Sequence, residues 1–225
     1  MVADFKFTEQ RHNKIIVIFL GLLFLVVIFS GWQFVSGQSL LSSSVEFLAS
    51  LKSGSQLQPT IDQSDPSFGP TEAPNKIVVF ADFQCPYSAQ FDAEINKLKA
   101  LNSSQFQVVW KDFPNYQIHA QATSSALAAR CAQAQGKFWE YGSQLFLNQV
   151  TLGETLYLKI AKDLKLDQEK FYRCLKSGEF TAPIEAGFKE GIRLGITGTP
   201  YLFVNDKRAD GVISVEQILA GLKLK

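Results

Sequence analysis

The chain has 225 residues, of which 46% are hydrophobic and 19% are charged, and this length suits one ordinary domain with a further segment. Because 22 basic residues are balanced by 21 acidic ones, the chain has no positive excess for phosphate contacts, and we expect no nucleic-acid partner. The 15 Gly and 8 Pro residues exclude a collagen-like or wholly disordered chain.

The N-terminal segment has the pattern of a membrane anchor. Residues 15–35 contain no charged side chain and are about as long as a helix that crosses a bilayer. Three basic residues precede this stretch, and the next basic residue is Lys52. The positive-inside rule therefore predicts that residues 1–14 are cytoplasmic and that the domain lies outside the cytoplasm, in a single-pass protein of a bacterial cell membrane. A cleaved signal peptide is the alternative reading of the same stretch.

A polar segment follows the predicted anchor. Residues 36–73 are rich in Ser, Gln, Gly and Pro, which indicates a flexible linker that holds a domain off the membrane. Outside the cytoplasm, disulfides in that domain would persist.

Residues 74–225 alternate between strand and helix patterns and form the predicted folded domain. Short apolar runs with β-branched residues indicate strands, and apolar residues at helical spacing indicate helices. Predicted strands cover 76–81, 105–111, 201–205 and about 209–213, and predicted helices begin at Cys85 and cover 120–134, 136–147, 155–164, 167–175, 184–194 and 214–222. The predicted fold class is therefore α/β, with a block of helices between the second and third strands.

Cys85 stands where the first predicted strand gives way to a helix, with Pro86 at the first helical position. Free backbone N–H groups and the positive end of the helix dipole would surround its sulfur. Cysteines in such places have a lowered thiol pKa, and the thiolate is the form that attacks a disulfide. A buried and inert cysteine is the alternative.

This order of elements resembles the DsbA-like branch of the thioredoxin superfamily, which includes DsbA and BdbD relatives. The stretches that carry the resemblance are ADFQCPYSAQF (81–91), residues 111–146, FYRCLKSG (171–178) and GITGTPYLFVN (195–205). The resemblance implies a thioredoxin fold with an α-helical insertion over about 117–178. It also implies exported thiol–disulfide exchange on the cysteines of other proteins. We expect no cofactor, and three cysteines without clustered histidines match no usual zinc site.

Ser88 departs from the family pattern, which places a second cysteine at this position. A hydroxyl cannot store an internal disulfide, and it cannot release a mixed disulfide formed at Cys85. We therefore expect monothiol exchange, in which an external thiol or redox partner releases Cys85, while Ser88 is able to hydrogen-bond the thiolate. Tyr87, inside the motif, would tune the site or contact the substrate, as the resemblance implies.

Thr199 and Pro200 match the cis-proline loop that faces the active cysteine in this superfamily. An X–Pro bond reaches the cis form far more readily than other peptide bonds. The resemblance implies that backbone groups of Thr199 pair with an extended substrate. An ordinary trans proline at the start of an edge strand is the alternative.

Cys131 and Cys174 lie on two predicted helices, 43 residues apart. In an oxidising compartment a structural disulfide is the simplest state for such a pair, and closing that loop is worth about 4 kcal/mol in the chain-entropy model. Two free buried thiols and a second redox pair that serves Cys85 are the alternatives.

Two titratable residues, His119 and Asp82, are weaker candidates for a role at Cys85. His119 could stabilise a thiolate as an imidazolium, although a packing or capping role is favoured. Asp82 directly precedes the Cys85 corner, where a solvated turn residue is favoured over an acid–base group.

Two other functions compete with thiol–disulfide exchange on proteins. One is an enzyme that uses glutathione or a similar small thiol, since kappa-class glutathione transferases share the architecture and carry Ser near this corner. The other is a non-catalytic thioredoxin-like binding module or holdase that captures extended chains beside Pro200.

Overall fold

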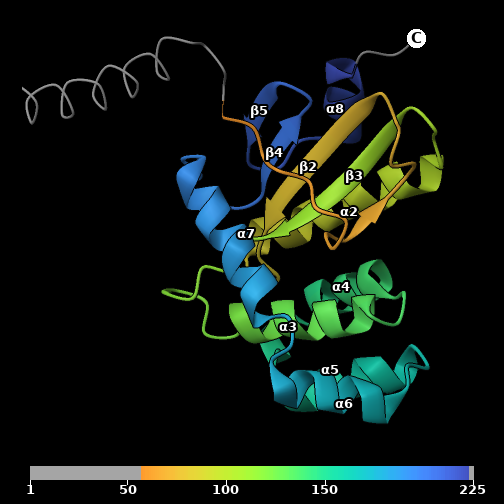
Figure 1. Cartoon of the computed structure of the whole chain (residues 1–225), viewed down its shortest axis with the longest axis vertical. Helices are drawn as coiled ribbons and strands as arrows, with labels where there is room; N and C mark the ends of the chain where they lie inside the picture. Colours follow the sequence, from red (N-terminus) through yellow and green to blue (C-terminus); the bar gives the residue numbers. More distant parts are fainter. Residues whose placement is uncertain (1–56, 223–225) are drawn as a thin grey trace, which may run out of the picture. The chain divides into compact units, whose positions relative to one another are not determined.

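A five-stranded sheet in the order β1-β3-β2-β4-β5 forms the centre of the computed structural model, which describes residues 57–222 (Figure 1). The strands are β1 (Ser67–Phe68), β2 (Asn75–Ala81), β3 (Phe106–Asp112), β4 (Tyr201–Val204) and β5 (Lys207–Asp210). β2 pairs in parallel with β3, and the other pairs are antiparallel. Residues 77–81 of β2 form a continuous apolar run because β2 is central in the sheet and this part of it is buried on both faces.

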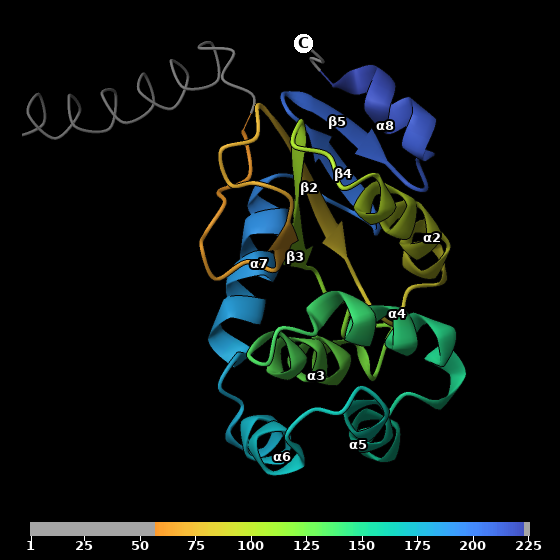
Figure 2. The same ribbon diagram turned by 90° about the vertical axis from the view of Figure 1, so that its right-hand side faces the viewer.

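Seven α-helices and one short 3-10 helix accompany the described sheet. They are α2 (Pro86–Leu101), α3 (Ala122–Gln133), α4 (Phe138–Leu147), η1 (Gln149–Thr151), α5 (Glu154–Asp163), α6 (Gln168–Ser177), α7 (Thr181–Arg193) and α8 (Val215–Gly221). Figure 2 shows α2 and α8 on one face of the sheet, α7 on the other face, and α3 to α6 at one end. We call α3 to α6, with η1, the helical region. It lies between β3 and α7, within the range predicted for the insertion.

Each face of the sheet has its own apolar core. Ile77 and Val79 of β2 belong to the larger cluster, which includes the buried side of α2 and the helical region. Val78 belongs to the smaller cluster on the opposite face. α7 packs very closely there, since a Cβ atom at Gly187 would lie 2.7 Å from the carbonyl oxygen of Asp112.

The last hairpin is tighter than its sequence suggested. We expected a turn at 206–208 and a strand at 209–213, but Val204 pairs with Lys207 and β5 ends at Asp210. The turn needs only two residues because Asn205 adopts a φ of 55°, a left-handed conformation that Asn tolerates better than most residues.

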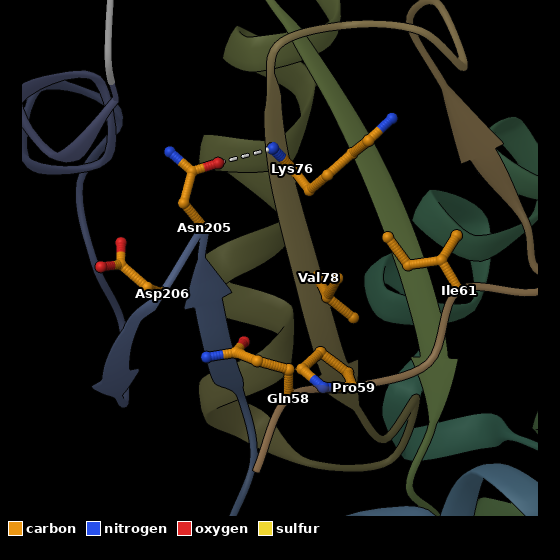
Figure 3. Close-up of a pocket in the computed structure, with 7 residues that line it drawn as sticks. All are labelled: Gln58, Pro59, Ile61, Lys76, Val78, Asn205 and Asp206. Carbon is orange, nitrogen blue, oxygen red and sulfur yellow. Dashed lines mark hydrogen bonds between the residues drawn. The ribbon is translucent and has the colours of Figure 1, made fainter. Parts of the chain in front are cut away.

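The second half of the expected flexible linker is bound to the domain, contrary to expectation. We call residues 57–66 the strap. The backbone N–H of Thr60 donates to the Glu190 carboxylate at 2.6 Å, and the N–H of Trp110 donates to the carbonyl of Pro66 at 2.8 Å. Figure 3 shows the strap crossing β2, where a cavity of about 290 Å³ lies between them. The composition of residues 57–66 indicated a spacer, because composition does not reveal the hydrogen bonds that these residues make to Glu190 and Trp110.

Buried charges hold the strap in place. The Lys111 ammonium lies 2.6 Å from Asp65 of the strap and 3.3 Å from Glu190 of α7. The Arg130 guanidinium donates to the carbonyl of Ser64 at 2.8 Å. Arg130 also pairs with the Asp112 carboxylate at 2.6 Å. Since both cations are nearly inaccessible to solvent, their pairing with carboxylates is required for burial.

The predicted cytoplasmic N-terminus (1–14), the anchor (15–35) and residues 36–56 of the linker lie outside the described residues. Within 57–222, the structure contains no helix with the length and apolar character needed to cross a membrane.

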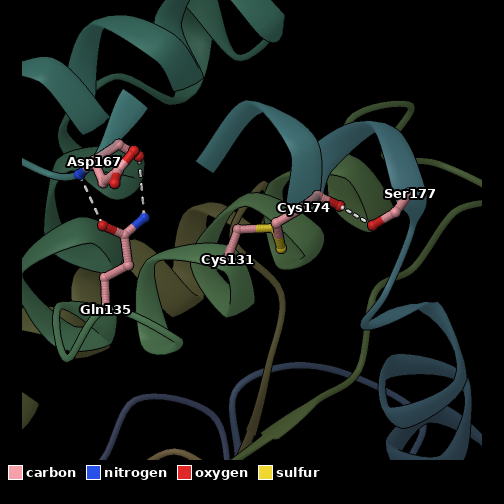
Figure 4. Close-up of a disulfide and its surroundings, with 5 residues drawn as sticks. All are labelled: Cys131, Gln135, Asp167, Cys174 and Ser177. Atoms are coloured by element: carbon pink, nitrogen blue, oxygen red, sulfur yellow. Dashed lines mark hydrogen bonds between the residues drawn. A yellow bond between two sulfur atoms is a disulfide. The ribbon is translucent and has the colours of Figure 1, made fainter. Parts of the chain in front are cut away.

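Cys131 of α3 and Cys174 of α6 form a disulfide (Figure 4). Beside it, the side-chain amide of Gln135 bonds both the backbone carbonyl and the backbone N–H of Asp167. These contacts tie α6 and the turn before it to α3, so the helical region is cross-linked within itself.

We expect the double variant Cys131→Ala/Cys174→Ala to lose about 4 kcal/mol of unfolding free energy, because its unfolded chain gains the entropy of an open 43-residue loop. Denaturant unfolding of the oxidised protein measures the loss. A double variant as stable as the oxidised protein would show that the bond does not stabilise the fold.

We expect Lys111→Met to lower the unfolding free energy by about 3–5 kcal/mol, because it leaves the Asp65 and Glu190 carboxylates buried beside an apolar side chain. Lys159→Met is the matched control, since Lys159 pairs with Asp163 on the surface and its loss should cost less than about 1 kcal/mol. Equal losses in the two variants would contradict the role given to the buried charges.

Candidate active site

Cys85 is the N-cap residue of α2. Its backbone is extended, with φ −75° and ψ 124°, and Pro86 occupies the start of the helix. The carbonyl of Cys85 accepts the first helical bond from Ala89 at 3.1 Å, while its side chain makes no capping bond. The sulfur therefore lies beside a helix N-terminus whose free N–H groups favour negative charge.

The loop that precedes β4 faces this sulfur. The Thr199–Pro200 peptide bond is cis, and the Cys85 thiol donates to the carbonyl of Thr199 at 3.2 Å. Gly211 fixes the loop from the other side, because its N–H donates to the Pro200 carbonyl at 3.0 Å. The fold thus brings together two motifs that lie 114 residues apart in the sequence.

The other motif residues divide between the surface and the core. Pro86 and Tyr87 are exposed, Tyr87 by 61%. Ser88 is buried on the inner side of α2, and its hydroxyl oxygen accepts a long bond of 3.4 Å from the backbone N–H of Asp82. This bond uses the Ser88 oxygen as an acceptor and leaves the hydroxyl proton available, so the hydrogen bond expected from Ser88 to a Cys85 thiolate stays a prediction, while the thiol itself bonds Thr199.

Asp82 is a buried hydrogen-bond centre and not the solvated turn residue that we expected. One carboxylate oxygen accepts from the N–H of Gln84 at 2.8 Å. The other accepts from the N–H of Asn115 and lies 2.8 Å from Nδ1 of His119. His119 therefore bonds the Asp82 carboxylate, which holds the turn before Cys85 in place. This contact agrees with the packing role favoured for His119. Three partners replace water at Asp82 and permit its burial.

Phe83 anchors the same corner through its ring, which stacks on Trp110 with centroids 4.7 Å apart and lies 5.1 Å from the ring of Phe146 in α4. Gly142 leaves room for this ring, since a Cβ atom there would come within 2.9 Å of it. The residue just before the active-site turn is thus packed into the helical region.

A further contact comes from η1. The side-chain amide of Gln149 donates to the carbonyls of Phe83 and Cys85, at 2.9 Å and 3.0 Å. Sequence reasoning missed this residue, because nothing in the pattern around position 149 places its side chain beside a motif 64 residues away. For Asp82, its place directly after the apolar run 77–81 of β2 was an available signal of burial.

No cluster of three or more metal-ligating side chains occurs in the part of the chain that the structure describes. The position of Cys85 at a helix N-terminus, beside the Thr199 carbonyl, supports nucleophilic attack by its sulfur in the thiolate form.

Comparison with known proteins gives matches over most of the described domain. Residues 62–223 match the family model Thioredoxin_4, described as thioredoxin. A thioredoxin-like oxidoreductase from Silicibacter pomeroyi is 27% identical, with a TM-score of 0.61 over 71% of this chain and 91% of that one. BdbD from Bacillus subtilis is 23% identical, with a TM-score of 0.63 over 74% of this chain and 96% of that one, which shows a shared fold.

Curated relatives share this domain as part of much longer proteins. The Na(+)/H(+) antiporter NhaA 3 of Salinispora tropica is 32% identical over 154 residues, which are 68% of this chain and 24% of that protein. The chain thus spans about a quarter of the length of the antiporters that it matches. The family match and the helical region inserted into the sheet fold together establish that the chain belongs to the thioredoxin family and is DsbA-like and BdbD-like in architecture.

Proposed function

We propose that the chain is a thiol–disulfide oxidoreductase that acts on protein disulfides through Cys85 alone, in a domain held outside the cytoplasm by a membrane anchor at residues 15–35. The observation that carries the proposal is the 3.2 Å contact between the Cys85 sulfur and the Thr199 carbonyl, next to the cis Pro200. The family match supports the reaction class. The apolar N-terminal stretch supports the location.

The reaction starts at the Cys85 thiolate. Its sulfur attacks one sulfur of a substrate disulfide, the substrate S–S bond breaks, and the other substrate sulfur leaves as a thiolate. An external thiolate then attacks the substrate sulfur of this mixed disulfide and displaces the Cys85 thiolate, which leaves the external thiol joined to the substrate. A second external thiolate attacks the first external sulfur, and the substrate sulfur leaves as a thiolate. In sum, the substrate disulfide is reduced to two thiols and two external thiols become one disulfide.

Thr199 has a double role in this proposal. In the thiol state its carbonyl accepts the S–H of Cys85. Once Cys85 has ionised, the sulfur no longer donates, and the carbonyl is free to accept a backbone N–H from an extended substrate. When the Cys85 thiol ionises, the Thr199 carbonyl therefore becomes available to the substrate at the same time. Ser88 carries no sulfur to exchange, and its part in this proposal is a hydrogen bond from its buried hydroxyl to the Cys85 thiolate.

We expect the full chain, incubated with the disulfide-bonded protein insulin, to form a covalent adduct at Cys85. The adduct should be absent from Cys85→Ser and should be released by added dithiothreitol, and intact-mass spectrometry detects both results. Saturable turnover with glutathione alone would instead indicate a small-thiol enzyme. Unchanged insulin binding by Cys85→Ala, with no adduct in the wild type, would indicate a binding module.

We expect Ser88→Cys to create an internal disulfide with Cys85, because residues 85 and 88 lie one helical turn apart at the start of α2. The variant should gain dithiol oxidase activity, measured as the oxidation of a reduced model protein. Ser104→Cys is the control, since it adds an exposed thiol beyond the opposite end of α2. Absence of oxidase activity in Ser88→Cys would contradict the assignment of the site.

A further inference from the structure

The helical region contacts the backbone of the Cys85 corner directly. η1 follows α4, and its first residue, Gln149, directs its side chain at the carbonyl oxygens of Phe83 and Cys85. Both partners are acceptors only, so the NH₂ end of the amide must face them, and both of its hydrogens are used. A residue outside the active-site motif therefore bonds the nucleophile's own peptide group.

A second bond supports the same contact. The N–H of Gln121, at the start of α3, donates to the side-chain oxygen of Gln84 at 2.6 Å. Together with the bonds from Gln149, it gives each residue from Phe83 to Cys85 a hydrogen bond to the helical region. The orientation of the corner thus depends on a part of the chain that supplies no reacting atom.

We propose that Gln149 is a positioning residue for Cys85. Its amide holds the Cys85 carbonyl, which also accepts the first helical bond from Ala89. Fixing this carbonyl fixes the peptide plane from which the sulfur extends, and it keeps the sulfur aligned with the free N–H groups of α2. The amide also brings the positive end of its own dipole to the corner, which favours the thiolate. This inference rests on the proposed function, in which Cys85 is the nucleophile.

Gln149→Met tests the proposal, because Met has a similar length and removes both donors. The rate of alkylation of Cys85 by iodoacetamide is measured over a range of pH. We expect the pH of half-maximal rate to rise by about half a unit, which corresponds to a rate about threefold lower at a pH below that midpoint, the size expected for one net hydrogen bond.

Gln135→Met is the matched control. Gln135, in the connection between α3 and α4, is also half-buried, and its amide also makes two hydrogen bonds, but these join that connection to Asp167 (Figure 4). We expect this variant to lower the melting temperature by a similar amount and to leave the pH profile unchanged. Identical profiles for Gln149→Met and the wild type, or equal shifts in the two variants, would overturn the positioning role.

Gln149→Glu keeps the proposal testable if the Met variant does not fold. A carboxylate of the same size would face two carbonyl oxygens and add a negative charge beside the sulfur, so the midpoint should rise further than in the Met variant. An unchanged midpoint would again overturn the proposal. The alkylation assay needs no disulfide substrate, so failure of the proposed function would appear separately, as a wild-type chain that alkylates normally but forms no adduct with insulin.

Discussion

The Asp82 carboxylate is the contact on which the active-site geometry depends. It lies at the carboxyl end of the central strand and is bonded by the N–H of Gln84, the N–H of Asn115 and the ring of His119. The backbone of the same residue accepts the N–H of Cys85 and donates to the hydroxyl of Ser88. One residue thereby links the sheet, the loop after β3 and the first turn of α2, and leaves the sulfur little freedom to move away from the helix N-terminus.

The corner is held from two sides by different kinds of interaction. On the sheet side the contacts are hydrogen bonds to Asp82, which fix direction. On the side of the helical region they combine the apolar packing of the Phe83 ring against Phe146 with the directional bonds of Gln149. Apolar packing alone would hold the corner in place without orienting its peptide groups, because burial is non-directional. The amide supplies that orientation, and so the inserted helices contribute to the site as well as to the core.

The sequence predicted the parts of this fold that local pattern determines. The run that became β2, the N-terminal proline of α2 and the short last helix were all readable, because each depends on neighbouring residues. The binding of the strap to the domain was not predictable, because its polar composition is that of a spacer. What holds it is the ion pair between Asp65 and Lys111, which are distant in sequence. At the site, the motifs around Cys85 and Pro200 were identifiable, whereas Asp82 and Gln149 act through contacts between residues distant in sequence.

The serine at position 88 is compatible with this architecture while it changes the chemistry. Its hydroxyl oxygen accepts the N–H of Asp82, so it takes part in the hydrogen bonding that fixes the corner. A hydroxyl is a stronger acceptor than a thiol, and a small polar group is well placed on the buried side of the first helical turn. What the chain loses is the second sulfur, and with it the internal route that would end a mixed disulfide. The lifetime of a substrate adduct in the proposed reaction is then set by the supply of external thiol and by its access to Cys85, which is only 6% exposed.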